Sequence, residues 1–253
     1  MADTIANVRW MWLLIVLAGC RQIFGISDPA ALADAPSTVH FDAPPPDTLP
    51  GGPIVHFAFD ALSNDLTLDS SGHHHDAACS NPSCPTPVAG ELGNALKFGS
   101  SSGTAKNLTV AASTEFAFTH GFTVAFWIEL TQLPMLQGCP LTQEGVFWIC
   151  VASTGAITYL AMTTGAGTLE STALLQMGKF EHVAVTYDGA RATIYINGAA
   201  DQSTGEPMPA MGNSSLVLGT DIETGSVLPA TLDELEIWTR PLSASEIAIL
   251  GGP

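Results

Sequence analysis

The sequence has few basic residues. Its 253 residues include 7 Lys and Arg against 24 Asp and Glu, which gives a formal net charge of −17. Binding to nucleic acid needs a basic patch that neutralises phosphates, and docking on anionic lipid also needs basic side chains. The composition therefore argues against both functions. It suits a soluble chain and is compatible with divalent cations.

The sequence also lacks a long apolar run and the common motifs of catalysis. The apolar run Trp10–Ala18 follows Arg9, and it is about half as long as the roughly twenty residues that a membrane-spanning helix needs. No His-Glu-x-x-His motif and no phosphate-binding loop of the Gly-x-x-x-x-Gly-Lys-Ser/Thr type occurs in the chain. None of these signatures therefore indicates an enzyme.

The short apolar run fits the h-region of a signal peptide. It ends in Leu17-Ala18-Gly19-Cys20, which resembles the lipobox of bacterial lipoproteins, whose Cys is lipidated and becomes the mature N-terminus. On this resemblance residues 1–19 are a lipoprotein signal peptide and Cys20 is the lipidation site. The alternative is an ordinary secretory signal with a chance Cys. The resemblance implies an exported protein that meets the membrane only through its lipid. Arg21, in place of Asp, favours the outer membrane of the cell envelope.

Residues 20–53 are expected to form a tether after the lipidated Cys. They contain Asp28-Pro29, Pro44-Pro45-Pro46 and Pro50-Gly51-Gly52-Pro53. Proline lacks an amide N–H and favours extended polyproline II structure over helix and sheet. At ~3.1 Å per residue, an extended tether holds the following domain up to about 100 Å from the membrane.

Residues 54–253 are predicted to form one all-β domain. Short apolar or alternating runs recur between Gly, Asn, Asp and Pro, and helical periodicity is almost absent. This pattern is typical of a sandwich or barrel. Asp188-Gly189 and Asn197-Gly198 supply the positive φ that tight hairpin turns require.

One short helix is expected near the C-terminus. Ser243 and Glu246 have the spacing of a capping box, in which each side chain satisfies a backbone N–H of the other residue. The apolar residues Ile247 and Leu250 follow, and Gly251 is expected to end the helix.

Several segments of this region match the laminin-G-like jelly roll in order and spacing. They are Phe57–Asp60, Asp69–Gly72, Gly90–Phe98, Phe122–Ile128, His182–Gly189, Ile194–Gly198, Leu232–Trp238 and Arg240–Ile247. The chain resembles this family, which is part of the concanavalin A-like lectin/glucanase superfamily, over about residues 57 to 250. The resemblance implies an antiparallel two-sheet jelly-roll sandwich with a short C-terminal helix.

The resemblance also implies a structural calcium site. Many family members hold calcium where the first and last strands meet, and the matching carboxylates here are Asp60, Asp69 and Asp233, with the Gly72 carbonyl as a further donor. Calcium takes several oxygen ligands of these kinds. The alternative is that these Asp residues cap turns or accept hydrogen bonds from backbone amides.

Four cysteines remain after Cys20, and they are expected to form disulfides. An even number in an oxidising compartment indicates disulfides. Three pairings are possible, and we expect the local one, Cys79–Cys84 and Cys139–Cys150. Each bridge closes a short loop and contributes roughly 2–3 kcal/mol in the loop-entropy model.

The tract His73-His74-His75 lies close in sequence to Cys79 and Cys84, which suggests zinc because His and Cys are its ligands. A disulfide would remove the thiolates, and polar residues are usual in this loop of the family. A short His tract is also only compositional evidence. The sequence therefore favours a polar loop without a metal here.

A glucanase is the enzymatic alternative for this fold. Glycoside hydrolysis needs two carboxyl groups about 5–9.5 Å apart, which related folds supply as Glu-x-Asp-x-(x)-Glu on one strand. That pattern requires Glu at position 231, which is Thr231. Glu234 and Glu236 are instead expected on an exposed strand face, opposite core-facing Leu235 and Ile237. The sequence therefore predicts a protein that is not an enzyme.

Aromatic side chains are the remaining candidates for a sugar site. Trp127 and Trp238 lie in strands that form the family core, so they are expected to be buried. Trp148 and Tyr159 lie in the variable middle strands. Either side chain could face a groove or the core, and we expect both to face the core.

Together these features predict a lipid-anchored module at the cell surface that binds a glycan or a protein of the envelope or the extracellular space. A structural envelope lipoprotein with a protein partner is the alternative, and a glycoside hydrolase the third choice. A groove with convergent aromatics would favour the glycan. A flat apolar patch would favour the protein partner. Two carboxyl groups in one cleft would favour the hydrolase.

Overall fold

The computed structural model describes residues 49–99, 103–163, 165, 167–205, 209, 212–220 and 224–252. The signal peptide, Cys20 and most of the predicted tether lie outside the described residues. Within the described part of the chain, no helix is long and apolar enough to cross a membrane.

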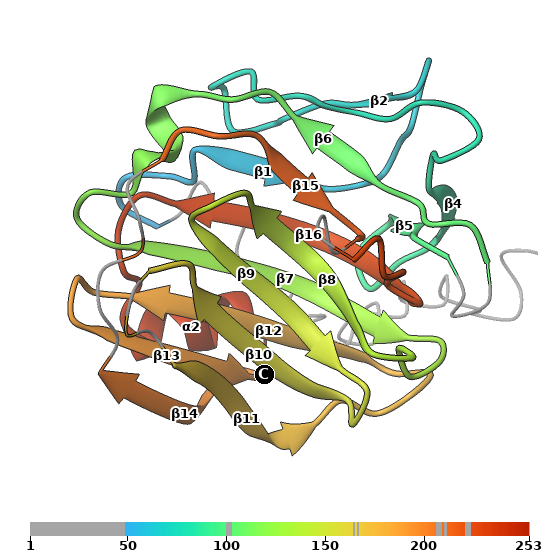
Figure 1. The fold of residues 1–253 in the computed structure, drawn as a ribbon. Coiled ribbons are helices and arrows are strands. Elements are labelled where there is room, and N and C mark those ends of the chain that lie inside the picture. The colour runs from blue at the N-terminus through green and yellow to red at the C-terminus, as the bar shows by residue number, and fades with distance from the viewer. Residues whose placement is uncertain are drawn as a thin grey trace, which may run out of the picture. The chain divides into compact units, whose positions relative to one another are not determined.

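Two antiparallel sheets lie face to face, with the second in front of the first in Figure 1. The first sheet has the order β14 (Ala199–Gly205), β13 (Arg191–Ile196), β12 (Phe180–Tyr187), β7 (Phe122–Leu130), β16 (Ala230–Trp238), β5 (Asn94–Lys97) and β4 (Thr86–Ala89), and β1 (Val55–Phe57) pairs with β16 beside this path. The second has the order β11 (Thr168–Leu174), β10 (Ala156–Ala161), β9 (Phe147–Ala152), β8 (Gln137–Gln143), β15 (Leu216–Leu218), β6 (Leu108–Val110), β3 (Ala77–Ala78) and β2 (Leu66–Thr67). The predicted two-sheet sandwich is confirmed.

The core lies between the sheets and is built by the alternation of side chains along each strand. Phe122 of β7 and Phe147 of β9 belong to opposite sheets, and their rings stack with centroids 4.8 Å apart. Leu235 and Ile237 of β16 are fully buried in the same core, as predicted.

The helix α2 (Ala244–Leu250) packs on the outer face of the first sheet. Ser243 and Glu246 form the predicted capping box, and Gly251 follows the helix. A second buried cluster joins the helix to the sheet through Ile247, Trp238 and Ala125. The helix therefore covers part of the sheet surface that would otherwise face water.

Strand β16 departs from simple alternation. Its pairing with β7 shifts between Asp233 and Glu236, and Glu234 has a φ of 45°. This bulge places Glu236 on the outer face beneath the helix, where it is 5% exposed and accepts a hydrogen bond from Trp238 Nε1 at 3.0 Å. Leu235 and Ile237 face the core as predicted, but the predicted exposure of Glu234 and Glu236 is wrong, because other groups cover the opposite face. His56 contacts Glu234, whose side chain is 18% exposed, and Trp238, which packs with α2, contacts Glu236.

Candidate functional site

Asp69 holds the loop after β2 against β1. Its Oδ1 accepts the backbone N–H groups of His56 and Ser71, both at 2.9 Å, and its Oδ2 accepts the His75 N–H at 2.9 Å and the Ser71 hydroxyl at 2.8 Å. Burial alone raises the pKa of this carboxyl group, but these donors outweigh burial and lower the pKa below its ordinary value. Asp69 is therefore an ionised acceptor whose four hydrogen bonds order the loop.

Asp60 and Asp233 contact the turn between β4 and β5. Asp60 is exposed, and its Oδ1 accepts the Asn94 N–H at 2.8 Å. Asp233 is fully buried, and its Oδ2 accepts the Leu92 N–H at 2.9 Å. The pKa of Asp233 is raised to about 7, chiefly by burial and also by the charge of nearby Glu234, and the backbone donors oppose both effects.

The structure does not bring the three predicted calcium ligands together. Among the described residues, Asp60, Asp69 and Asp233 form no group whose ligand atoms lie within 4.8 Å of one another. Each carboxylate instead accepts backbone N–H groups, which is the alternative role for these residues. Calcium binding by this set stays a prediction.

A shallow groove of about 200 Å³ opens beside the loop that follows β1. Its lining residues are Ala58, Phe59, Asp60, Ala61, Ser63, Leu66, Thr67, Leu68 and Ser70. Asp60 is the only carboxyl group among these lining residues. The groove therefore lacks the pair of acids that glycoside hydrolysis requires.

A chain of hydrogen bonds connects the rim of this groove to β16. Ser70 Oγ lies 2.7 Å from His56 Nδ1, and His56 Nε2 lies 2.6 Å from Glu234 Oε2. These residue types also occur in the triads of serine hydrolases. The Ser70 hydroxyl has the His56 carbonyl oxygen, 3.1 Å away, as an acceptor besides the ring, so its proton is not directed to the imidazole alone. The arrangement ties two strands together.

Apolar side chains gather on the loops at one end of the sandwich. Leu133, Met135 and Leu136, between β7 and β8, are 40%, 79% and 71% exposed, and Met177, between β11 and β12, is 61% exposed. Met177 pairs with Leu130 at the end of β7, which brings the two loops side by side. We call these four exposed residues the apolar loop end. They were not among the candidate site residues predicted from the sequence, where their signal is the short apolar run Leu133-Pro134-Met135-Leu136.

A second groove, of about 280 Å³, borders the apolar loop end. It is lined by Met135, Leu136, Gln137, Thr224, Gly225, Ser226 and Val227. These described lining residues combine two exposed apolar side chains with hydroxyl and amide groups, and none of them carries a carboxyl group. This composition suits a binding surface better than a reacting site.

The aromatic candidates for a sugar site are mostly enclosed. Trp238 and Tyr159 are fully buried, as predicted, and Trp148 is only 9% exposed. Trp127 differs from its predicted burial, because it is half-buried on the outer face of the first sheet. Its ring meets that of His182 with centroids 5.3 Å apart. The helix α2 packs over the neighbouring Ala125 cluster, and Trp127 is not part of that cluster.

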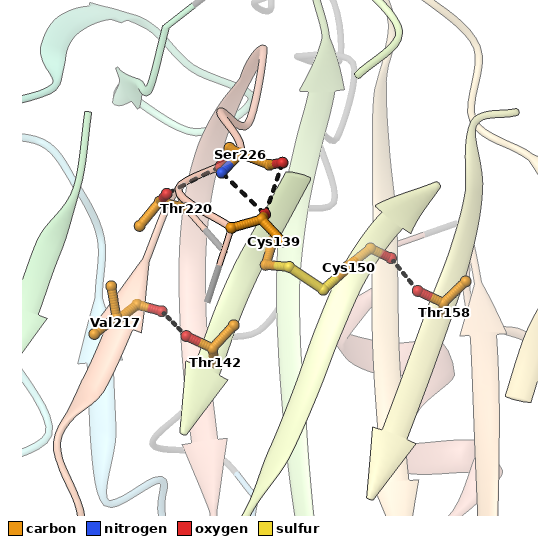
Figure 2. The surroundings of a disulfide bond; sticks show 8 residues. Cys139, Thr142, Cys150, Thr158, Val217, Thr220 and Ser226 are labelled. Atoms are coloured by element: carbon orange, nitrogen blue, oxygen red, sulfur yellow. Dashed lines mark hydrogen bonds between the residues drawn. A yellow bond between two sulfur atoms is a disulfide. The ribbon is translucent and has the colours of Figure 1, made fainter. Parts of the chain in front are cut away.

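Both expected disulfides are present. Cys139 of β8 and Cys150 of β9 are joined across neighbouring strands, as Figure 2 shows, and Cys79 is joined to Cys84. Thr158 beside the first bridge donates to the Cys150 carbonyl oxygen at 3.3 Å. Because the sulfurs of Cys79 and Cys84 are bonded to each other, the combined His and Cys zinc site considered from sequence does not form.

Comparisons with known proteins agree with this architecture. Residues 102–248 match the family model described as concanavalin A-like lectin/glucanases superfamily. No curated protein matches the sequence.

Solved structures with the same fold include bacterial binding domains. The binding domain of Paraclostridial Mosquitocidal Protein 1 has a TM-score of 0.63 and 16% identity, with 79% of this chain and 51% of that chain covered. Domain 4 of AbnA, a GH43 extracellular arabinanase from Geobacillus stearothermophilus, has a TM-score of 0.62 and 17% identity, with 79% and 98% covered. The Botulinum Neurotoxin serotype G binding domain has a TM-score of 0.60 and 16% identity, with 79% and 50% covered.

The present chain thus spans about half the length of the toxin binding domains and nearly the whole of the arabinanase domain. At these identities the likeness concerns the fold.

Proposed function

Because the chain belongs to the concanavalin A-like lectin/glucanase superfamily, we propose that it is a non-catalytic binding module that takes a protein partner at its apolar loop end. The observation that carries this proposal is the exposure of Met135 and Leu136, at 79% and 71%, beside a groove of about 280 Å³. Exposed apolar groups that adjoin polar groups mark protein contacts. The fold alone does not choose a function, because function depends on the site.

The side chains at this end favour protein over sugar. The large apolar side chains that are exposed among the described residues are all Leu, Met or Ile. Met is enriched at the centres of protein interfaces and adapts its shape to irregular surfaces, whereas stacking on a sugar ring uses an aromatic face. Gln137, Thr224 and Ser226 supply hydrogen-bonding groups at the rim.

The charge of the molecule restricts the partner further. A net charge of −17 repels acidic surfaces, and like charges across an interface suppress binding. We therefore expect the partner to present an apolar centre with a neutral or basic surround.

A glycan ligand is the second candidate, and half-buried Trp127 is the observation that favours it. Domain 4 of the arabinanase was solved in complex with arabinotriose. A binding domain of Botulinum Neurotoxin DC was solved with SialylT and also with rat synaptotagmin II. The arabinanase domain, which this chain spans almost completely, thus has a sugar ligand, whereas this chain spans only about half of the toxin domains.

The absence of catalysis is supported by the lining of the two grooves. Among the described lining residues, Asp60 is the single carboxyl group of one groove, and none is found in the other. An acid and a nucleophile or base must flank one glycosidic bond. We therefore expect no release of reducing sugar from any polysaccharide that the protein contacts.

We also propose that the protein is exported and anchored by lipid at Cys20, with residues 21–53 as a tether to the outer membrane. The lipobox-like Leu17-Ala18-Gly19-Cys20 supports this. Labelling with a fatty-acid analogue tests it. The native chain should incorporate label and sediment with membranes, and Cys20→Ser should do neither. Equal labelling of the two proteins would contradict the anchor.

Site-specific photocrosslinking tests the proposed partner surface. A photoreactive residue replaces Leu136 in one protein and Leu68 in a control, because these side chains are similarly exposed, at 71% and 66%, in different grooves. We expect a discrete protein adduct from position 136 that excess unlabelled protein prevents. Affinity of the purified partner should then fall at least tenfold with Leu136→Asp and stay unchanged with Leu68→Asp. Equal adducts at both positions, or none at position 136, would reject this surface.

The glycan candidate is tested on immobilised polysaccharides. Retention of the native protein on a polymer, with retention lost in Trp127→Ala and kept in Leu136→Asp, would show that the ligand is a sugar. That result would reject the protein partner. A lack of retention on every polymer would leave the protein-partner proposal standing.

A further inference from the structure

Two histidines and one glutamate from separate loops converge on one point of the surface. His73 Nδ1 lies 2.9 Å from Glu115 Oε1, and His75 Nε2 lies 2.7 Å from Glu115 Oε2. The two histidines follow β2, and Glu115 belongs to the short 3-10 helix η2 (Thr114–Ala117). One ligand atom from each residue lies within 4.8 Å of the other two.

The spacing of these atoms is close to that of a metal coordination shell. Ligand atoms bound to zinc at ~2.0–2.1 Å in a tetrahedron lie about 3.3 Å apart. The contacts of 2.9 Å and 2.7 Å between imidazole nitrogen and carboxylate oxygen are slightly shorter. Small side-chain rotations would therefore open the cluster enough to admit an ion.

Neighbouring groups hold the two histidines in this arrangement. Asp69 Oδ2 accepts the His75 N–H at 2.9 Å, and Ser71 Oγ accepts the His73 N–H at 3.2 Å. The His75 ring packs on Phe116, with centroids 4.6 Å apart. The rings of His73 and His75 are nearly parallel, at 15°. The fold therefore already restricts the conformations of both histidines, so metal binding would lose less conformational entropy.

Glu115 is fixed from the other side. The Ser113 side chain caps η2 by accepting the Glu115 N–H at 3.2 Å. Phe116, the next residue, is fully buried and anchors the helix in the core. The carboxylate thus projects from an anchored turn towards the histidines.

We propose that His73, His75 and Glu115 bind one divalent transition-metal ion of the zinc class, with at least one coordination position open to solvent. Two imidazoles and one carboxylate suit zinc and similar metals and suit calcium poorly, because calcium prefers oxygen ligands. The open position follows from the exposure of the His73 and Glu115 side chains, each 40%. The site uses neither cysteines nor the three predicted calcium ligands, and it is independent of the proposed partner surface.

His74 provides a matched control within the same tract. It is exposed and has a φ of 63°, and it is not a member of the metal-ligating group. Its imidazole is therefore outside the group that His73 and His75 form with Glu115. Binding that depends only on a local excess of histidine would therefore respond equally to all three positions, whereas the proposed site would not respond to His74.

Calorimetric titration with Zn²⁺ and the visible absorption of bound Co²⁺ test the site in the full chain. We expect one ion per chain and a tetrahedral Co²⁺ spectrum. Affinity should fall at least tenfold with His73→Ala, His75→Ala or Glu115→Gln, and stay within twofold of the native value with His74→Ala. An excess of Ca²⁺ should not displace the ion. Circular dichroism of each variant without metal checks that the fold is intact.

Failure of the native chain to bind Zn²⁺ would overturn the proposal. It would also be overturned if His74→Ala weakened binding as much as His73→Ala, because the ion would then be held by the tract without Glu115. A Co²⁺ spectrum of an octahedral ion that is unchanged by Glu115→Gln would have the same consequence.

Discussion

Several buried or half-buried polar side chains of this molecule bind particular backbone donors and acceptors. Glu181 Oε2 accepts the Gln176 N–H at 2.7 Å, and Gln143 Nε2 donates to the Phe116 carbonyl oxygen at 3.1 Å. Asp69 makes four such bonds. A buried donor left without a partner costs about 1–3 kcal/mol. These hydrogen bonds therefore hold loop segments in place.

Asp69 distinguishes a structural carboxylate from a calcium ligand. Replacing it with Ala leaves the N–H groups of His56, Ser71 and His75 without their acceptor, so we expect a loss of about 1–3 kcal/mol in the free energy of unfolding. Urea denaturation measures this loss with calcium and with chelator, and Glu170→Ala serves as the control at an exposed carboxylate outside the predicted calcium set. The same loss in both buffers is expected. A loss that appears only with calcium would show that Asp69 holds the ion.

Asp233 makes stability depend on pH. Its pKa of about 7 lies above the ordinary value of 3.8 because the carboxyl group is buried. Between these values the folded state holds more protons than the unfolded state, so stability should fall as pH rises from about 4 to 7 and level off above that. Unfolding in urea across this range measures the slope. Asp233→Asn should flatten it, and an unchanged slope would assign the effect to another group.

At the level of elements, β16 is the strand on which the first sheet depends. It pairs with β7 and β5, and β1 also pairs with it. The second sheet is instead reinforced covalently, because the Cys139–Cys150 bridge joins β8 to β9. The Trp148 ring packs against this bridge. The two sheets therefore resist disruption by different means.

The Cys139–Cys150 bridge closes a loop with a sequence separation of 11 residues, and the Cys79–Cys84 bridge one of 5. By loop entropy their removal should cost ~2.8 and ~2.2 kcal/mol. For a domain of this size the first corresponds to a fall of about 6–11 °C in Tm. Calorimetry of Cys139→Ser/Cys150→Ser tests this, with Cys79→Ser/Cys84→Ser for comparison. An unchanged Tm would mean that the bridge does not constrain the unfolded chain.

Local chemistry made many elements predictable, and long-range contacts limited the rest. The Ser243 cap and the turn at Asn197-Gly198 depend on residues adjacent in sequence, and both formed as expected. The bulge at Glu234 was not predictable, because alternation assumes one residue per position. The pairing of His73 with Glu115 joins positions 42 residues apart, which no local pattern relates.

The whole molecule carries an unbalanced charge. With 24 acidic against 7 Lys and Arg residues, the net charge of −17 creates repulsion that opposes compaction. Salt shortens the Debye length from about 30 Å at 0.01 M to about 8 Å at 0.15 M. We therefore expect Tm to rise over this range of NaCl, and sucrose at equal osmolality controls for general solute effects. A fall in Tm would indicate that ion pairs outweigh repulsion.

The pairing of β1 with β16 has a consequence for biosynthesis. Val55 of β1 lies opposite Ile237 of β16. β1, the first of the described strands to be synthesised, therefore cannot pair until β16, the last of them, has also been synthesised. Until Ala230–Trp238 has emerged, β7 and β5 also lack the neighbour that separates them in the finished sheet. A nascent chain stalled before residue 230 should therefore remain sensitive to protease. We expect such a polypeptide to stay unfolded until its synthesis is nearly finished, which is the state that the proposed export through a narrow translocation pore would require.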